Sequence, residues 1–117
     1  MKIYGIKNCD TVKKARKWLD DQGIAYEFHD FKKDGLDESQ LSRWEQTVGW
    51  ETLLNRRGTT WRKLPDDVRD TIGAQSAHDI MLANPSIIKR PVVEHDGTVS
   101  VGFKAEDWAK QFSNVQV

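Results

Sequence analysis

The sequence predicts an α/β fold: a four-stranded mixed sheet with helices on it, in a thioredoxin-like order that a helical insertion interrupts. Three observations support this prediction. The first third of the chain has a strand–helix–strand pattern, the middle has helical periodicity, and the last third has two strands, an Asp-Gly turn between them and a final helix. A helix between two strands of similar direction indicates a βαβ unit with a parallel pair. We therefore expect a single domain over residues 1–117, with the insertion at about residues 36–84.

The first third predicts a strand at residues 2–6, a helix at residues 10–19 and a second strand at residues 26–31. Gly23 is expected to end the helix as a left-handed cap. Apolar residues recur along this helix at helical spacing, which gives it one apolar side. That side is formed by Val12, Ala15, Trp18 and Leu19.

The middle of the chain predicts several short helices. Capping boxes, a first-turn proline and helix-stopping residues mark their ends. These signals are, in order, Asp37 with Gln40, Gly49, Pro65, Ser76 with Asp79, and Asn84 with Pro85. The first of these helices has an apolar stripe of Leu41, Trp44 and Val48. A short apolar segment at residues 50–54 then precedes a basic loop at residues 55–60.

The last third changes to the period of a strand. Residues 91–94 and 99–103 are expected to pair as a hairpin around the turn at residues 95–98, because Asp-Gly is a favoured pair in such turns. A final helix is expected at residues 104–112. The tail at residues 113–117 is expected to be loose.

Composition narrows the classes of function. Eighteen basic and eighteen acidic residues cancel, so bulk charge does not favour binding to nucleic acid. The chain has neither the apolar run of a signal peptide nor a stretch of about 20 apolar residues that could cross a membrane. Its one cysteine cannot form an internal disulfide, and its three histidines are far apart in sequence, so we expect no metal. These features predict a cytoplasmic protein without a membrane partner, and a monomer.

Cys9, the only cysteine, lies where a short turn meets the start of the first helix. A thiol there meets unpaired backbone N–H groups and the positive end of the helix dipole. Lys7, Lys13 and Lys14 add positive charge nearby. These effects favour the thiolate, which is the nucleophilic form. Cys9 is therefore a candidate catalytic or redox residue, and the alternative is a small buried apolar side chain.

The position three residues after Cys9 is occupied by Val12 rather than by a second cysteine. A redox reaction at Cys9 would need a resolving thiol from outside the chain, such as glutathione or a partner protein. A tyrosine-phosphatase loop would need an arginine at Ala15, and no phosphate-binding loop is present. The lone cysteine thus favours thiol chemistry over phosphate chemistry.

Three arginines are candidates for binding an anion. Arg90 precedes Pro91, and in a thioredoxin-like layout a proline that enters the third strand is typically cis and faces the cysteine. Arg90 would then pair with a substrate carboxylate or oxyanion near Cys9. The alternative is a surface arginine before an edge strand. Arg56 and Arg57 form either an anion clamp or ordinary solvated charge, and the sequence leaves open which of the two would point inward.

Three blocks of the chain resemble the arsenate reductase (ArsC)/Spx family, and most closely its YffB-like branch. The blocks are Tyr4-Gly5-Ile6-Lys7-Asn8-Cys9-Asp10-Thr11-Val12-Lys13-Lys14-Ala15, Leu53-Leu54-Asn55-Arg56-Arg57-Gly58-Thr59 and Asn84-Pro85-Ser86-Ile87-Ile88-Lys89-Arg90-Pro91-Val92. The resemblance implies a nucleophile at Cys9 and an arginine of the oxyanion site at Arg90. The resemblance implies three arginines around the cysteine, of which Arg90 matches one. Asn55 stands at the position of the second, and Val101-Gly102-Phe103 at that of the third. The chain therefore departs from the family at both of these positions.

The resemblance implies a bacterial glutathione-dependent thiol reductase that acts on disulfides or mixed disulfides. Glutathione would be the cosubstrate, glutaredoxin a further partner, and no metal would be required. Two alternatives stay open: an arsenate reductase that uses glutathione and glutaredoxin, and a non-enzymatic regulator that binds RNA polymerase as Spx does. The expected site consists of Cys9 as the catalytic residue, with Asn8, Lys13, Arg56, Arg57, Arg90 and Pro91 binding the substrate or glutathione.

Overall fold

The computed structural model describes residues 1–112, and the expectation of a loose tail at residues 113–117 lies outside them. The chain separates into two compact units. The first consists of residues 1–30 with the C-terminal segment that starts at Arg90, and the second consists of residues 31–89. Within the described residues, no helix is long and apolar enough to cross a lipid bilayer.

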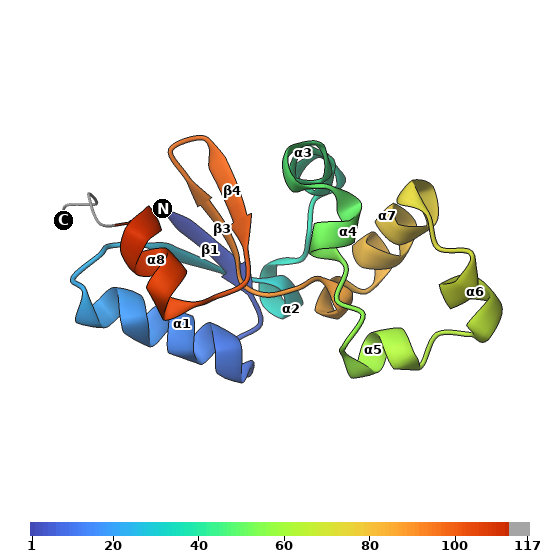
Figure 1. Ribbon diagram of the computed structural model, residues 1–117, viewed down its shortest axis with the longest axis horizontal. Helices are drawn as coiled ribbons and strands as arrows, with labels where there is room; N and C mark the ends of the chain where they lie inside the picture. The colour runs from blue at the N-terminus through green and yellow to red at the C-terminus, as the bar shows by residue number, and fades with distance from the viewer. Residues whose placement is uncertain (113–117) are drawn as a thin grey trace. The chain divides into compact units, whose positions relative to one another are not determined.

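The first unit is built on a four-stranded sheet in the order β2-β1-β3-β4 (Figure 1). Its elements are β1 (Lys2–Gly5), α1 (Asp10–Asp21), β2 (Glu27–Asp30), β3 (Val92–His95), β4 (Thr98–Val101) and α8 (Ala105–Gln111). Strand β1 runs parallel to β2 and antiparallel to β3, and β3 pairs with β4 antiparallel. The predicted four-stranded mixed sheet is therefore confirmed.

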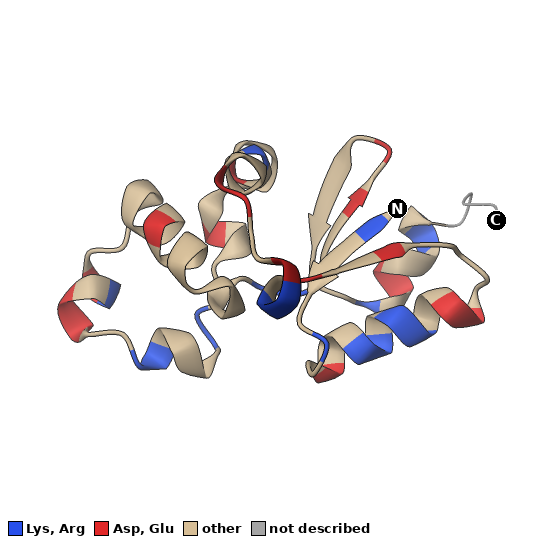
Figure 2. Cartoon of the chain, turned by 180° about the vertical axis from the view of Figure 1, so that it is seen from behind, with Lys and Arg blue, Asp and Glu red and all other residues tan. Residues whose placement is uncertain are grey.

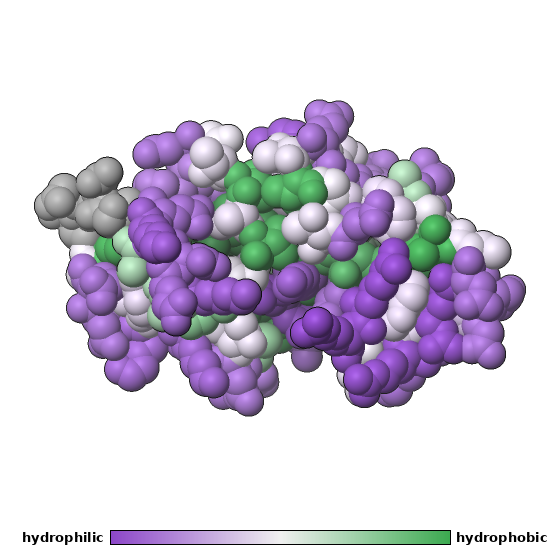
Figure 3. Space-filling view, viewed as in Figure 1, coloured by the Kyte–Doolittle hydropathy of each residue, from purple (hydrophilic) through white to green (hydrophobic). Residues whose placement is uncertain are grey.

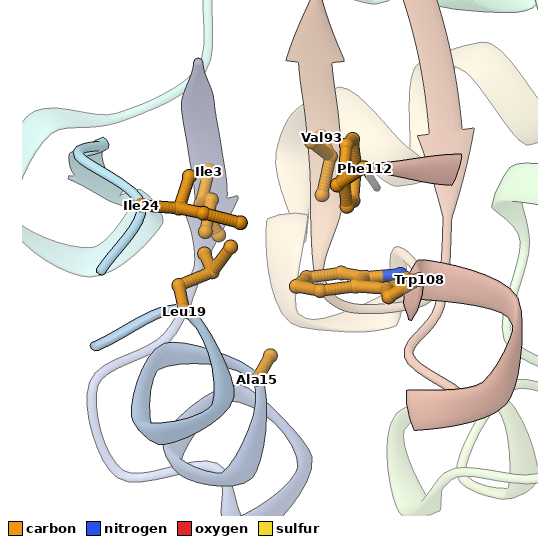
Figure 4. Packing of buried hydrophobic residues seen from close by; sticks show 7 residues of the cluster. All are labelled: Ile3, Ala15, Leu19, Ile24, Val93, Trp108 and Phe112. Carbon is orange, nitrogen blue, oxygen red and sulfur yellow. The ribbon is translucent and has the colours of Figure 1, made fainter. Parts of the chain in front are cut away.

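The core of the first unit lies between the sheet and the two helices α1 and α8 (Figure 4). Successive residues of a strand face opposite sides of the sheet, so Ile3 turns toward the helices while its neighbour Tyr4 turns away. Trp108 of α8 is buried and meets the ring of Phe112 edge-on, with centroids 5.3 Å apart. The buried members of the cluster are Ile3, Ala15, Leu19, Ile24, Val93, Trp108 and Phe112. Away from this core the surface over α1 is mainly hydrophilic (Figure 3).

The second unit is helical. Its elements are α2 (Phe31–Asp34), α3 (Glu38–Val48), α4 (Trp50–Leu53), α5 (Thr59–Arg62), α6 (Asp66–Asp70), α7 (Ala74–Ala83) and the short 3-10 helix η1 (Pro85–Ile87). Phe31, which the sequence placed at the end of a strand, begins α2 instead. It is buried and meets Trp44 of α3 edge-on at 6.2 Å between ring centroids. Packing against Trp44 accounts for the earlier end of the strand.

The helix starts differ from the predicted capping boxes. Asp37 is the N-cap of α3, but its carboxylate accepts a hydrogen bond from Ser39 Oγ at 2.6 Å and caps no backbone N–H. Helix α7 begins at Ala74, earlier than predicted, because Gly73 is extended and serves as its N-cap. Ser76 then lies inside the first turn, and its hydroxyl accepts the N–H of Gly73 at 2.9 Å. Asp79, the predicted partner of Ser76, accepts from Gln75 instead.

The predicted hairpin between β3 and β4 is confirmed. Its two turn residues, Asp96 and Gly97, have φ angles of 49° and 77°. Two successive positive φ angles are typical of the tight turn that matches the twist of antiparallel strands, and Asp-Gly adopts them at low cost. The turn therefore sets the register in which β3 and β4 pair.

Candidate active site

Cys9 is the N-cap of α1, with φ −99° and ψ 126°. Its backbone N–H donates to the carbonyl of Ile6 at 3.2 Å, and its own carbonyl accepts the N–H of Lys13 at 2.9 Å. The residue is half-buried. The first hydrogen bond ties Cys9 to the end of β1 and the second ties it to the helix, so the sulfur is held at the N-terminus of α1.

The pKa of the Cys9 thiol is lowered although the side chain is half-buried. Burial raises the pKa, but hydrogen bonds from the backbone N–H of Val12, the side chain of Arg90 and the N–H of Thr11, together with the positive charge of Arg90, lower it by more. Donors and a cation near sulfur stabilise the thiolate and not the thiol. The described groups at this site therefore favour the nucleophilic form.

Arg90 and Pro91 directly precede β3, in the same unit as Cys9. The peptide bond between them is cis. Pro91 is buried, and its carbonyl accepts the N–H of Gly102 at 2.8 Å. Arg90 is half-buried and its side chain hydrogen-bonds to Cys9. The structure thus brings together two of the residues that the sequence assigned to one site, Cys9 and Arg90.

Asn8 and Lys13 flank Cys9 along the chain, but both are exposed. Basic residues lie along the middle of α1, with acidic residues at its ends (Figure 2). The groups that lower the pKa of Cys9 within residues 1–112 are Val12, Arg90 and Thr11, and Lys13 is not among them. The proposed contacts of Asn8 and Lys13 with a substrate stay predictions.

Arg56 and Arg57 are exposed and belong to the second unit. The guanidinium of Arg56 lies 5.7 Å from the ring centre of Trp50 and 5.5 Å from that of Trp61, so cation–π contacts hold it. The backbone N–H of Arg57 donates to Asn55 Oδ1 at 3.0 Å. Asn55 therefore shapes the loop that carries both arginines, and the role of the arginines toward Cys9 stays a prediction.

A second group of titratable side chains, which sequence reasoning did not single out, joins α3 to α7 in the helical unit. His78 Nδ1 lies 2.6 Å from Glu45 Oε1, and His78 Nε2 lies 3.4 Å from Glu38 Oε1. The hydrogen bond and charge of Glu45 and the weaker pull of Glu38 raise the pKa of His78 against the opposite effect of burial. The three side chains line a pocket of about 470 Å³ between α3, α4 and α7.

Sequence reasoning also missed the individual roles of Thr11 and Val12. Their backbone N–H groups point at the sulfur because they occupy the first turn after an N-cap, where such groups have no partner inside the helix. The position of Cys9 just before the helix was the signal for them. In the described part of the chain, no group of three or more His, Cys, Asp or Glu side chains could hold a metal ion.

Comparison with known proteins places the chain among proteins with this architecture. The sequence model of the ArsC family matches residues 4–111. An arsenate reductase (ArsC) related protein from Brucella melitensis is 60% identical, with a TM-score of 0.80 over 95% of this chain and 92% of the other. A YffB protein is 50% identical, with a TM-score of 0.88 over 93% of this chain and 96% of the other. The predicted ArsC-like form of the thioredoxin fold is thereby confirmed.

A more distant relative is a regulator of transcription. The global transcriptional regulator Spx of Streptococcus agalactiae serotype V is 26% identical over 102 residues, which are 86% of this chain and 74% of the regulator. The chain is thus similar both to a protein named as a regulator and to one named as arsenate reductase related.

Proposed function

Because the chain belongs to the ArsC family, we propose that it is a glutathione-dependent thiol reductase whose nucleophile is Cys9. The observation that carries the proposal is the pairing of Cys9 with Arg90 at the N-terminus of α1, where the pKa of the thiol is lowered. The chain has no second cysteine, so the thiol that resolves an adduct has to come from another molecule.

In the proposed reaction, the Cys9 thiolate attacks the glutathione sulfur of a mixed disulfide R–S–S–G. The substrate S–S bond breaks, a Cys9–glutathione disulfide forms, and R–S⁻ leaves with the electron pair and takes up a proton from water. The thiolate of a second glutathione then attacks the glutathione sulfur of the adduct. This step forms glutathione disulfide and returns Cys9 as the thiolate. One turnover transfers two electrons from glutathione to the substrate.

The proposal gives the other predicted residues supporting roles. Arg90 both stabilises the thiolate and presents its guanidinium to a carboxylate of glutathione. Asn8 and Lys13 flank Cys9 along the chain and Pro91 follows Arg90, so these residues are the proposed contacts of the substrate beside Cys9 and Arg90. A role of Arg56 or Arg57 in binding a second carboxylate of glutathione stays a prediction. A reducing compartment such as the cytoplasm supplies the glutathione that the reaction consumes, and glutaredoxin is a further thiol partner.

The test is turnover of a glutathione mixed disulfide of a small thiol, in the presence of glutathione, glutathione reductase and NADPH. The wild-type protein is expected to consume NADPH faster than the solution without protein, and Cys9→Ser is expected to abolish that excess. Circular dichroism checks that Cys9→Ser keeps the fold. Arg90→Ala is expected to raise KM for the mixed disulfide, while Arg43→Ala, on the exposed side of α3, serves as the control. Full turnover by Cys9→Ser would rule out the mechanism.

Two alternatives have specific observations in their favour. The likeness to an arsenate reductase related protein favours reduction of arsenate, which the same coupled assay detects when arsenate replaces the disulfide. The likeness to Spx favours a regulator, in which Cys9→Ser would have no effect and the protein would retain RNA polymerase subunits in a pull-down. Turnover of the disulfide but not of arsenate supports the thiol reductase.

A further inference from the structure

Gly5 is the last residue of β1 and is buried. It is not among the glycines with a positive φ, so its backbone conformation does not require a glycine. The space around Gly5, in contrast, does require a glycine. A Cβ atom at this position would lie 2.8 Å from Cγ2 and 3.5 Å from Cγ1 of Val12. Carbon atoms in favourable contact are about 3.5–4.0 Å apart, so an added methyl group would force Val12 to move.

Val12 has little freedom to turn away. It is fully buried in the first turn of α1, and a β-branched side chain in a helix has one strongly preferred rotamer. An added methyl group at residue 5 would therefore displace the first turn of α1 and not only the Val12 side chain. Cys9 is held from the other side, since its N–H donates to Ile6 directly after β1. Moving α1 away from β1 would separate the Val12 backbone from the Cys9 sulfur.

We propose that Gly5 is a positioning residue for Cys9: its missing side chain lets Val12 pack directly against the end of β1, which keeps the Val12 N–H at the Cys9 sulfur. A residue in the sheet, without contact to any substrate, thereby sets the geometry around the nucleophile. The inference rests on the proposed function in one respect only, namely that the Cys9 thiolate acts as a nucleophile.

The test measures the pKa of Cys9 and not turnover. Because Cys9 is the only thiol of the chain, the rate of alkylation by iodoacetamide as a function of pH reports it directly. Gly5→Ala is expected to raise the midpoint of this curve by about half a pH unit or more, which slows alkylation about threefold at a pH below the midpoint. The reason is a longer hydrogen bond from Val12 to the thiolate.

A rescue variant separates this effect from general destabilisation. Val12→Ala removes both methyl groups that would meet the new Cβ atom but keeps the backbone N–H. The double variant Gly5→Ala/Val12→Ala is therefore expected to restore the wild-type midpoint, and Val12→Ala alone is its reference. Gly73→Ala is the matched control, because no heavy atom lies within 4 Å of a Cβ at that glycine. It is expected to leave the midpoint unchanged.

Two results would overturn the inference: a folded Gly5→Ala protein with an unchanged midpoint, and a double variant whose midpoint stays raised. If Gly5→Ala alone does not fold, the double variant decides. If the double variant folds and its midpoint equals that of the wild-type protein, the inference is supported. If the double variant does not fold, or if its midpoint stays raised, the inference is contradicted. A wild-type protein that turns over no disulfide would contradict the proposed function but would leave this measurement valid.

Discussion

The acidity of Cys9 is decided by a few neighbours at close range. Its half-buried position alone would favour the neutral thiol, and the first turn of α1 with Arg90 reverses that preference. The lysines beside Cys9 in sequence are exposed. Water and salt screen such charges strongly, whereas a hydrogen bond to the sulfur keeps its strength. The thiolate is therefore stabilised more by directed donors than by the number of nearby cations.

Arg90→Ala is expected to raise the pKa of Cys9, because it removes both a donor and a positive charge from the thiolate. The fraction of thiolate at neutral pH then falls, and alkylation at neutral pH slows several-fold while the rate at high pH stays the same. The pH profile of alkylation measures this shift. Lys13→Ala, which removes an exposed cation from α1, is the comparison. An effect of Lys13→Ala as large as that of Arg90→Ala would contradict the geometry of the site.

Individual site residues differ in how far the sequence predicts them. Cys9 could be placed at a helix start because the strand, turn and helix before and after it have clear patterns. Arg90 could be placed near Cys9 only through the thioredoxin-like order and the family resemblance, since the two lie far apart in sequence. The role of Gly5 could not be predicted, because it depends on a distance of a few ångströms between β1 and Val12.

At the scale of elements, the contact between α3 and α7 contains His78, whose pKa is raised. Both ring nitrogens of His78 face carboxylates, Glu45 on one side and Glu38 on the other. A neutral imidazole has only one N–H to donate, whereas the protonated ring has two. The protonated form therefore satisfies both contacts and ties α7 to two turns of α3.

The free energy of unfolding is expected to decrease as pH rises through the range in which His78 loses its proton. The pKa of His78 is raised in the folded protein, so its contribution is fully present below the unfolded value of about 6.5 and is lost as pH passes the higher folded value. Urea denaturation on both sides of this range measures the change. His78→Gln is expected to flatten the pH dependence, and the exposed Glu51→Gln on α4 is expected to leave it intact. An unaltered dependence in His78→Gln would refute the assignment.

Elements with a local signal were predicted better than those set by packing. The β3–β4 hairpin follows from the Asp96-Gly97 pair alone, and α1 follows from its apolar spacing. The start of α7 was misplaced because the sequence gives Ser76 and Asp79 the pattern of a capping box while Gly73 begins the helix. Likewise, Phe31 begins a helix instead of ending a strand because Trp44 packs against it, and no local sequence pattern indicates that contact.

The first unit as a whole depends on the core between its sheet and its two helices. Trp108→Ala is expected to lower the free energy of unfolding by about 3–5 kcal/mol, because it removes a large buried side chain that no neighbour can replace. That is a large part of the roughly 5–15 kcal/mol typical of a folded domain. Chemical denaturation followed by circular dichroism measures it. The half-buried Trp61 is the control, and a smaller loss is expected for Trp61→Ala.

With one cysteine in the whole chain, the oxidised protein has to take its partner sulfur from another molecule. The wild-type protein is expected to gain one glutathione when it is incubated with glutathione disulfide. Val12→Cys is expected to change this outcome, because the backbone N–H of residue 12 hydrogen-bonds to the Cys9 sulfur and a thiol at this position is therefore a candidate to displace glutathione. Mass spectrometry of the intact protein should then show the loss of two hydrogens and no adduct. Val12→Ser, which has no thiol, should keep the adduct. A stable glutathione adduct on Val12→Cys would mean that the side chain at this position cannot reach the sulfur, and that an external thiol is required by geometry as well as by composition.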